Sequence, residues 1–175
     1  SVVTQAEFDG HLDTLMMLRA EKAISLTNVR LEIPMRSEVV QYMVGFAREG
    51  GRVPQRYRYD WNVNQANNMG WFGAPDAGLH VKLKHTQDVW ELFSFKKVGL
   101  PDSWYNGGAG YAELVCEGGV ALLTAYCGDK VVQPGETVVW RVAYQVTPLK
   151  PIDAEKHWAQ RYYHTDTWTE PTPNL

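Results

Sequence analysis

Apolar and polar residues alternate along most of the chain, which is the pattern of β-strands with one face in a core. The clearest case is residues 79–84, where Leu, Val and Leu alternate with His, Lys and Lys. A second alternation covers residues 24–33, and its slip by one residue predicts a β-bulge near Asn28. Pro34 follows and is expected to end this strand. The same reasoning predicts further strands at residues 4–8, 12–19, 39–46, 90–98, 111–115, 120–126 and 137–146.

Residues 12–23 also fit a helix, because Leu, Met, Arg, Ala, Glu and Lys all favour helices. We favour a strand there because the next segment alternates so regularly. The continuous apolar run at residues 15–18 fits a strand that is covered on both faces. A helix is predicted instead at residues 153–163, with Asp153 as its N-cap.

Strands that follow one another through short turns predict antiparallel pairing. Turns containing Gly or Pro at residues 117–119 and 133–136 fit this kind of connection. The expected fold is therefore all-β, an antiparallel β-sandwich over residues 1–152. Residues 153–175 are expected to form a short C-terminal helical or linker segment.

The longest concentration of turn formers is Pro-Asp-Ser-Trp-Tyr-Asn-Gly-Gly-Ala-Gly at residues 101–110. Its glycines permit positive φ angles, so the chain can turn sharply here. Trp104 and Tyr105 contribute nothing to the solubility of such a loop. They either pack beneath it, which is common in β proteins, or contact a ligand.

The composition argues against several classes of function. The chain has 175 residues, of which 45% are hydrophobic, so one domain with a substantial core is expected. Its formal net charge of −3 gives no argument for binding to nucleic acid or to anionic membranes. No apolar stretch is long enough to span a bilayer. No signal peptide or initiator Met is visible, so the chain is expected to be processed or cut from a longer protein.

The two cysteines, Cys116 and Cys127, are too few for a zinc site, and their spacing matches no redox motif. They fit two buried free thiols, and a disulfide within a hairpin is the alternative. The glycines at residues 107–110 lack the Lys and Ser/Thr of a phosphate-binding loop. No cofactor, metal site or catalytic residue is predicted.

Aromatic and polar residues in or beside the loops form the candidate site. Residues 52–61 are rich in Arg, Tyr and Trp, and their guanidinium groups can stack on the rings to form a structural lattice or one wall of a groove. Sugars present apolar C–H faces to such rings, so carbohydrate binding is the functional interpretation. The candidate residues are Trp61, Asn62, Trp71, Trp104, Tyr105, Asn106 and Arg58. Core or interdomain packing is the alternative for each Trp.

Three motifs then occur in a familiar order. They are Ser-Trp-Tyr-Asn-Gly-Gly-Ala-Gly at residues 103–110, Val-Thr-Pro-Leu-Lys-Pro-Ile-Asp at 146–153 and His-Trp-Ala-Gln-Arg-Tyr-Tyr-His at 157–164. Their succession resembles large bacterial glycoside-hydrolase-like proteins related to glycoside hydrolase family 123. Trp-Phe-Gly at 71–73 and Gly-Leu at 78–79 extend the resemblance to about residues 40–168. The first 40 residues fit only in being rich in strands.

The resemblance implies a non-catalytic accessory sandwich, similar to the galactose-mutarotase-like supersandwich, in an exported and therefore extracytoplasmic protein. In those proteins the sandwich precedes a (β/α)-barrel, which is implied to follow residue 175 in the same polypeptide. The barrel carries an adjacent Asp-Glu pair, and no such dipeptide occurs in this sequence. Hydrolysis by this chain alone is therefore not expected. The residues expected to contact the barrel are His157, Trp158, Arg161, Tyr162, Tyr163 and His164.

Two other functions stay open. An autonomous carbohydrate-binding module would bind an oligosaccharide without the barrel. A mutarotase-like sugar epimerase would need a His acid and a Glu base, for which His80, His85 and Glu113 are available. No motif assigns them these roles.

Overall fold

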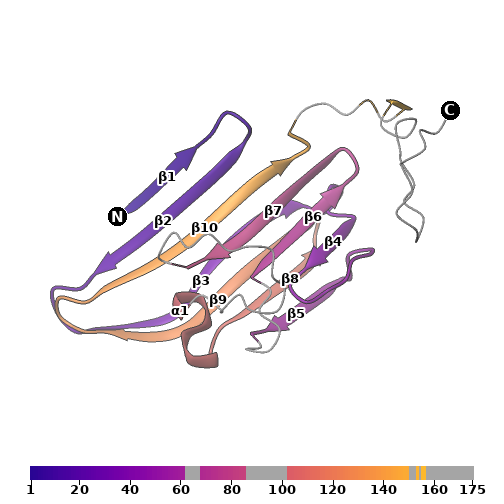
Figure 1. Cartoon of the computed structure of the whole chain (residues 1–175). Helices are drawn as coiled ribbons and strands as arrows, with labels where there is room; N and C mark the ends of the chain where they lie inside the picture. Colours follow the sequence, from indigo (N-terminus) through magenta and orange to yellow (C-terminus); the bar gives the residue numbers. More distant parts are fainter. Residues whose placement is uncertain (62–67, 86–101, 150–152, 154, 157–175) are drawn as a thin grey trace, which may run out of the picture.

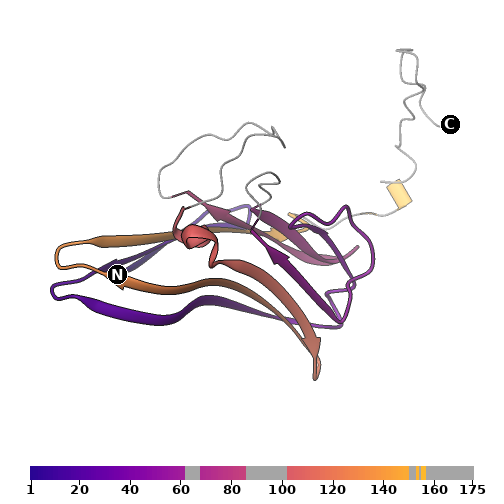
Figure 2. The same ribbon diagram turned by 90° about the horizontal axis from the view of Figure 1, so that it is seen from below.

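The computed structural model describes residues 1–61, 68–85, 102–149, 153 and 155–156. These residues form ten strands, a short helix and a 3-10 turn, and the strands make two layers (Figures 1 and 2). The elements are β1 (Val2–Ala6), β2 (His11–Arg19), β3 (Ile24–Arg36), β4 (Tyr42–Gly45), β5 (Arg56–Asp60), β6 (Met69–Ala74), β7 (Ala77–Lys84), α1 (Asp102–Tyr105), η1 (Asn106–Gly108), β8 (Tyr111–Glu117), β9 (Val120–Val132) and β10 (Thr137–Thr147).

The strands pair antiparallel throughout the described residues. The six-stranded sheet has the order β1-β2-β10-β7-β6-β4, and the four-stranded sheet has the order β3-β9-β8-β5. The chain passes between the sheets several times, and two of these connections are β2–β3 and β9–β10. These two connections lie side by side, because the N–H of Gly135 donates to the carbonyl of Ala20 and the N–H of Ala20 donates to the carbonyl of Glu136. The prediction of an all-β antiparallel sandwich is confirmed.

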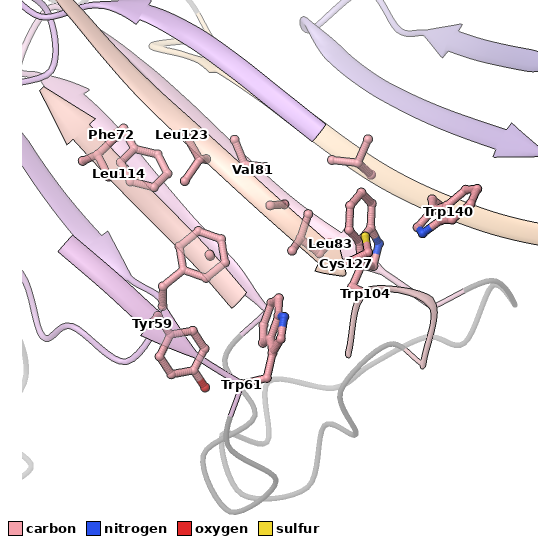
Figure 3. Close-up of a cluster of buried hydrophobic side chains, with 14 of the residues drawn as sticks. Tyr59, Trp61, Phe72, Val81, Leu83, Trp104, Leu114, Leu123, Cys127 and Trp140 are labelled. Carbon is pink, nitrogen blue, oxygen red and sulfur yellow. The ribbon is translucent and has the colours of Figure 1, made fainter. Parts of the chain in front are cut away.

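The hydrophobic core lies between the two sheets and follows the predicted alternation. On β7, Val81 and Leu83 are 0% and 1% exposed, and Leu114 and Leu123 of the other sheet are also buried. Figure 3 shows these side chains in one cluster. Burying a side chain of this size stabilises the fold by roughly 2 kcal/mol. The opposite side of each sheet faces away from the core and is called its outer face below.

Two predicted local features are confirmed. The register of β3 against β9 shifts on both sides of Val29, and Asn28 has a φ of 56°, so a bulge lies where the slip in the pattern predicted it. The backbone N–H of Asn28 donates to Asp129 Oδ1 at 2.8 Å. The turn between β8 and β9 consists of Gly118 and Gly119, whose φ values are 57° and 83°, as a two-residue hairpin turn requires.

Pro34 does not end its strand. It pairs with Leu122, and β3 continues to Arg36. The reason is that β3 is an edge strand of its sheet and has a neighbouring strand on one side only. Proline has no N–H to donate, and an edge strand tolerates it because the missing N–H need not belong to the hydrogen-bond ladder. The helix considered at residues 12–23 is also absent, since this stretch contains most of β2 and the turn that leads to β3.

The sequence pattern misses several elements. Residues 56–60 form β5 and residues 69–74 form β6, although neither was predicted as a strand. The short helix α1 and η1 occupy the glycine-rich segment that was predicted as a loop. The strand predicted at residues 90–98 lies outside the described residues. So does most of the predicted terminal helix, where Asp153 Oδ1 accepts a hydrogen bond from the N–H of Lys156, as a cap does.

The two cysteines are free, and the register excludes the hairpin disulfide. Cys116 on β8 lies opposite Ala121 on β9, six residues from Cys127. Six residues of strand span about 20 Å, whereas the Cα atoms of a disulfide lie about 6 Å apart.

Candidate functional site

The glycine-rich corner is anchored to the sandwich through the residues that were candidates for sugar binding. Trp104 is 2% exposed, and its Nε1 donates to the carbonyl of Arg141 at 3.0 Å. Figure 3 places its ring beside Cys127 and Trp140. Trp104 therefore packs in the core and offers no ring face to a ligand in this conformation. Tyr105 is half-buried and packs against the same core.

Asn106 holds this corner to β9. Its φ of 44° is left-handed, and its Nδ2 donates to the carbonyls of Cys127 at 2.7 Å and Asp129 at 3.0 Å. Both amide protons are thereby used within the domain. The amide of Asn106 has a structural role here, and only its oxygen remains as an acceptor for a ligand.

Two further candidates lie near the end of β5. Trp61 is 8% exposed, and its ring meets those of Tyr59 and Phe46 edge to face. Asn62 lies outside the described residues. The guanidinium of Arg58 lies 3.7 Å from the ring centre of Tyr111 and pairs with Asp60 at 2.8 Å.

The outer face of the four-stranded sheet is a lattice of paired side chains. Arg58 covers Tyr111, whose ring lies 4.7 Å from that of Tyr126 on β9. Arg56 pairs with Glu113 at 3.1 Å. Of the two interpretations of the Arg- and Tyr-rich segment, these contacts fit the structural lattice, because the ring of Tyr111 lies between the guanidinium and a second ring.

Trp71 has a different setting, on the outer face of the six-stranded sheet. Its indole lies against the backbone of two glycines. A Cβ added at Gly78 would come within 2.8 Å of three indole atoms, and a Cβ added at Gly73 would come within 2.8 Å of one of the same three, Cζ2. The indole Nε1 donates to Thr147 Oγ1 on β10 at 2.8 Å. The ring thus reaches across β7 from β6 to β10, and it is held flat on the sheet.

The strand register places Trp71 in a row that crosses five strands. Val44 pairs with Trp71, Trp71 with His80, His80 with Gln145, and Gln145 with His11. We call these five residues the Trp71 row. Val44 is 43% exposed, and the other four are half-buried. No sequence pattern indicates this row beyond Trp71 itself, because its members are brought together only by the pairing of distant strands.

Two polar members of the row, His80 and Gln145, can both offer uncharged hydrogen-bonding groups at pH 7. Burial, followed by the nearby charges of Lys82 and His11, lowers the pKa of His80 below its usual value, so its imidazole is neutral at pH 7. The Nε2 of Gln145 donates to the carbonyl of Asp9 at 2.9 Å. This bond fixes the carboxamide and leaves its oxygen as an acceptor.

A network of charged groups lies beside the row on the same face. Asp13 on β2 accepts two hydrogen bonds from Arg141 at 2.8 Å and one from Lys84 at 2.6 Å. The three side chains are only 16%, 17% and 22% exposed. Burial by itself raises the pKa of Asp13, but the two cations outweigh it and hold the pKa below its ordinary value.

His80 and Glu113, one pair that an epimerase could use, are not brought together. His80 lies on the outer face of the six-stranded sheet, whereas Glu113 lies on the outer face of the other sheet and pairs with Arg56. The whole core separates the two groups. The described residues also contain no cluster of three or more His, Cys, Asp or Glu that could hold a metal ion. None of their helices is long and apolar enough to cross a membrane.

Comparison with known families gives a match over most of the chain. The model of a family described as "Glycoside hydrolase 123, third domain" matches residues 1–148. The match includes the first 40 residues, which the individual motifs did not reach. No curated protein matches the chain. A third domain implies other domains in the same polypeptide, and the match covers all ten described strands. The chain therefore belongs to this family and is an accessory domain of glycoside hydrolase 123.

Proposed function

We propose that this sandwich is non-catalytic and supports a catalytic (β/α)-barrel of the same polypeptide, in an extracytoplasmic enzyme. The observation that carries the proposal is the separation of His80 and Glu113 on opposite outer faces. Acid and base groups that act on one sugar must both reach it, and the core stands between these two. Family membership supplies the context of a glycoside hydrolase.

A contact surface for the barrel is available where β10 ends. Val146 and Leu149 are 50% and 60% exposed, and both precede the segment that is proposed to lead to the barrel. Large apolar side chains that are exposed close together favour coverage by a neighbouring domain. We therefore place the first contact with the barrel at this end of the sandwich.

The test compares this chain alone with a longer polypeptide that includes the catalytic domain. We expect the single chain to unfold cooperatively and to hydrolyse no glycoside. Asp substitutions at Val146 and Leu149 should lower the unfolding temperature of the longer protein and leave that of the single chain nearly unchanged. The matched control is Val131→Asp, which changes a residue that is 57% exposed near the other end of the sandwich.

Three results would contradict the proposal. Hydrolysis by the single chain would make it catalytic. Equal effects of the substitutions on both proteins would show that Val146 and Leu149 contact no further domain. An effect of Val131→Asp as large as theirs would show that the response is not specific to this end.

A further inference from the structure

We infer that the Trp71 row is a saccharide-binding strip, with Trp71 as the stacking platform and His80 and Gln145 as its hydrogen-bonding partners. The ligand class is a neutral oligosaccharide. This role is additional to the support of a barrel, and either one can fail without the other.

The first support is the way in which the indole is held. One face of the ring rests on the backbone of Gly73 and Gly78, and the bond to Thr147 fixes its rotation. No aromatic ring or guanidinium from the described residues stacks on Trp71, in contrast to Tyr111. Trp71 is also half-buried, whereas Trp104 is buried. A preorganised ring of this kind loses little conformational freedom when a ligand stacks on it.

The second support is the chemistry beside the ring. The neutral imidazole of His80 offers one donor and one acceptor, and the Gln145 oxygen offers an acceptor. Hydroxyl groups of a sugar both donate and accept, so they match these neighbours. Val44 adds apolar surface on the other side of Trp71. The row crosses four interstrand spacings of about 4.8 Å each, or roughly 19 Å, which is long enough for more than one sugar ring.

The third support is that the row fits a sugar better than a protein. A stable protein interface buries about 800 Å² and some 20–30 residues on each side. The row consists of five residues, and the neighbouring Asp13, Arg141 and Lys84 already bind one another. A short strip with one aromatic platform suits a ligand whose contacts are a ring face and a few hydroxyl groups.

The experiment titrates the 175-residue chain with neutral oligosaccharides and follows backbone and indole N–H signals by NMR. The probes are chito-, cello- and xylo-oligosaccharides and an oligosaccharide that contains N-acetylgalactosamine. We expect at least one to shift the Trp71 indole signal and the amides of His80 and Gln145. Trp71→Ala should weaken that binding about tenfold, which corresponds to about 1.4 kcal/mol. Gln145→Ala should weaken it less.

Two controls make the result specific. Trp71→Phe keeps a ring on the glycines and should retain part of the affinity, which guards against a Trp71→Ala variant that fails to fold. Tyr126→Ala removes an aromatic ring from the opposite outer face and should leave the affinity unchanged.

Several results would overturn the inference. A folded wild-type chain that binds none of these saccharides is one, and shifts confined to the four-stranded sheet are another. A third is that Trp71→Ala lowers the unfolding temperature only in the polypeptide with the catalytic domain, while the wild-type chain binds no saccharide. The row would then be an interdomain contact. In that case the proposed support role would stand while the saccharide strip would fail.

Discussion

The charge of a single residue, Asp13, contributes directly to the stability of the six-stranded sheet. Its carboxylate on β2 accepts hydrogen bonds from Arg141 on the adjacent strand β10 and from Lys84 on β7, the strand beyond it. Two half-buried cations on one face would repel each other without it. Its contribution to stability is therefore tied to its ionisation.

Replacing Asp13 by Asn should destabilise the fold by about 2 kcal/mol at pH 7, because the hydrogen bonds of both cations lose their charged acceptor. The pKa of Asp13 is lowered by folding from an ordinary value of about 3.9. The carboxylate therefore stabilises fully above about pH 5, and this stabilisation is lost as the pH falls through the lower pKa of the folded state. Urea unfolding of the wild type and of Asp13→Asn, from pH 7 down to about pH 3, measures the difference between their free energies of unfolding. This difference should become smaller as the pH falls.

The control is Asp60→Asn. Asp60 and Arg58 form an ion pair whose side chains are 73% and 48% exposed, so its loss should change stability by less than about 1 kcal/mol. A gap between wild type and Asp13→Asn that stays constant down to low pH would show that the charge of Asp13 is not the cause.

At the scale of elements, the side-chain amide of Asn106 holds α1 and η1 against the sheet. Asn106 adopts a left-handed φ and donates twice to β9. Asn106→Ala should cost about 3 kcal/mol, from two hydrogen bonds at about 1 kcal/mol each and about 1 kcal/mol of backbone strain. Asn106→Gly loses the same bonds without that strain and should be less destabilising. Thermal unfolding of both variants would show which one is less stable. Equal losses of stability would mean that the left-handed backbone carries no strain.

Sequence patterns predict those elements whose burial follows a simple period. Residues 79–84 alternate because one face of β7 is in the core, and the bulge at Asn28 is visible as a slip in the same period. The segment of β5 reads as a basic patch because its outer face carries Arg and Asp and its inner face carries Tyr. β6 is hidden by its glycines, which accommodate Phe46 on one side of the sheet and Trp71 on the other.

The positions of the candidate residues in the fold could be predicted less well than the fold itself, for a physical reason. Position in a predicted loop was the criterion, yet Trp104 is in the short helix α1 and is buried, while Trp71 is in a strand and is half-buried. The row around Trp71 joins residues 11, 44, 80 and 145, and their proximity follows from strand order. Strand order depends on long-range packing, which no local pattern in the sequence reveals.

At the scale of the whole molecule, Cys127 reports on the integrity of the sandwich. It is 3% exposed, and burial raises the pKa of its thiol to about 12. In the Cys116→Ser variant, whose single thiol is Cys127, alkylation should be negligible in native buffer because neither access nor thiolate is available. Labelling in increasing urea should rise together with the loss of the circular dichroism signal. Rapid labelling of the folded protein would mean that the sheets separate locally without global unfolding.

The antiparallel order β1-β2-β10 also has a mechanical consequence. Val2 enters β1 at the end of the six-stranded sheet where β10 begins, and Thr147 leaves β10 at the opposite end. Tension between these two points acts along the strands, perpendicular to their hydrogen bonds. The bonds of the β1–β2 and β2–β10 ladders are then loaded together in shear and do not open one after another. A pull applied at these two points is therefore expected to be resisted by both ladders at once.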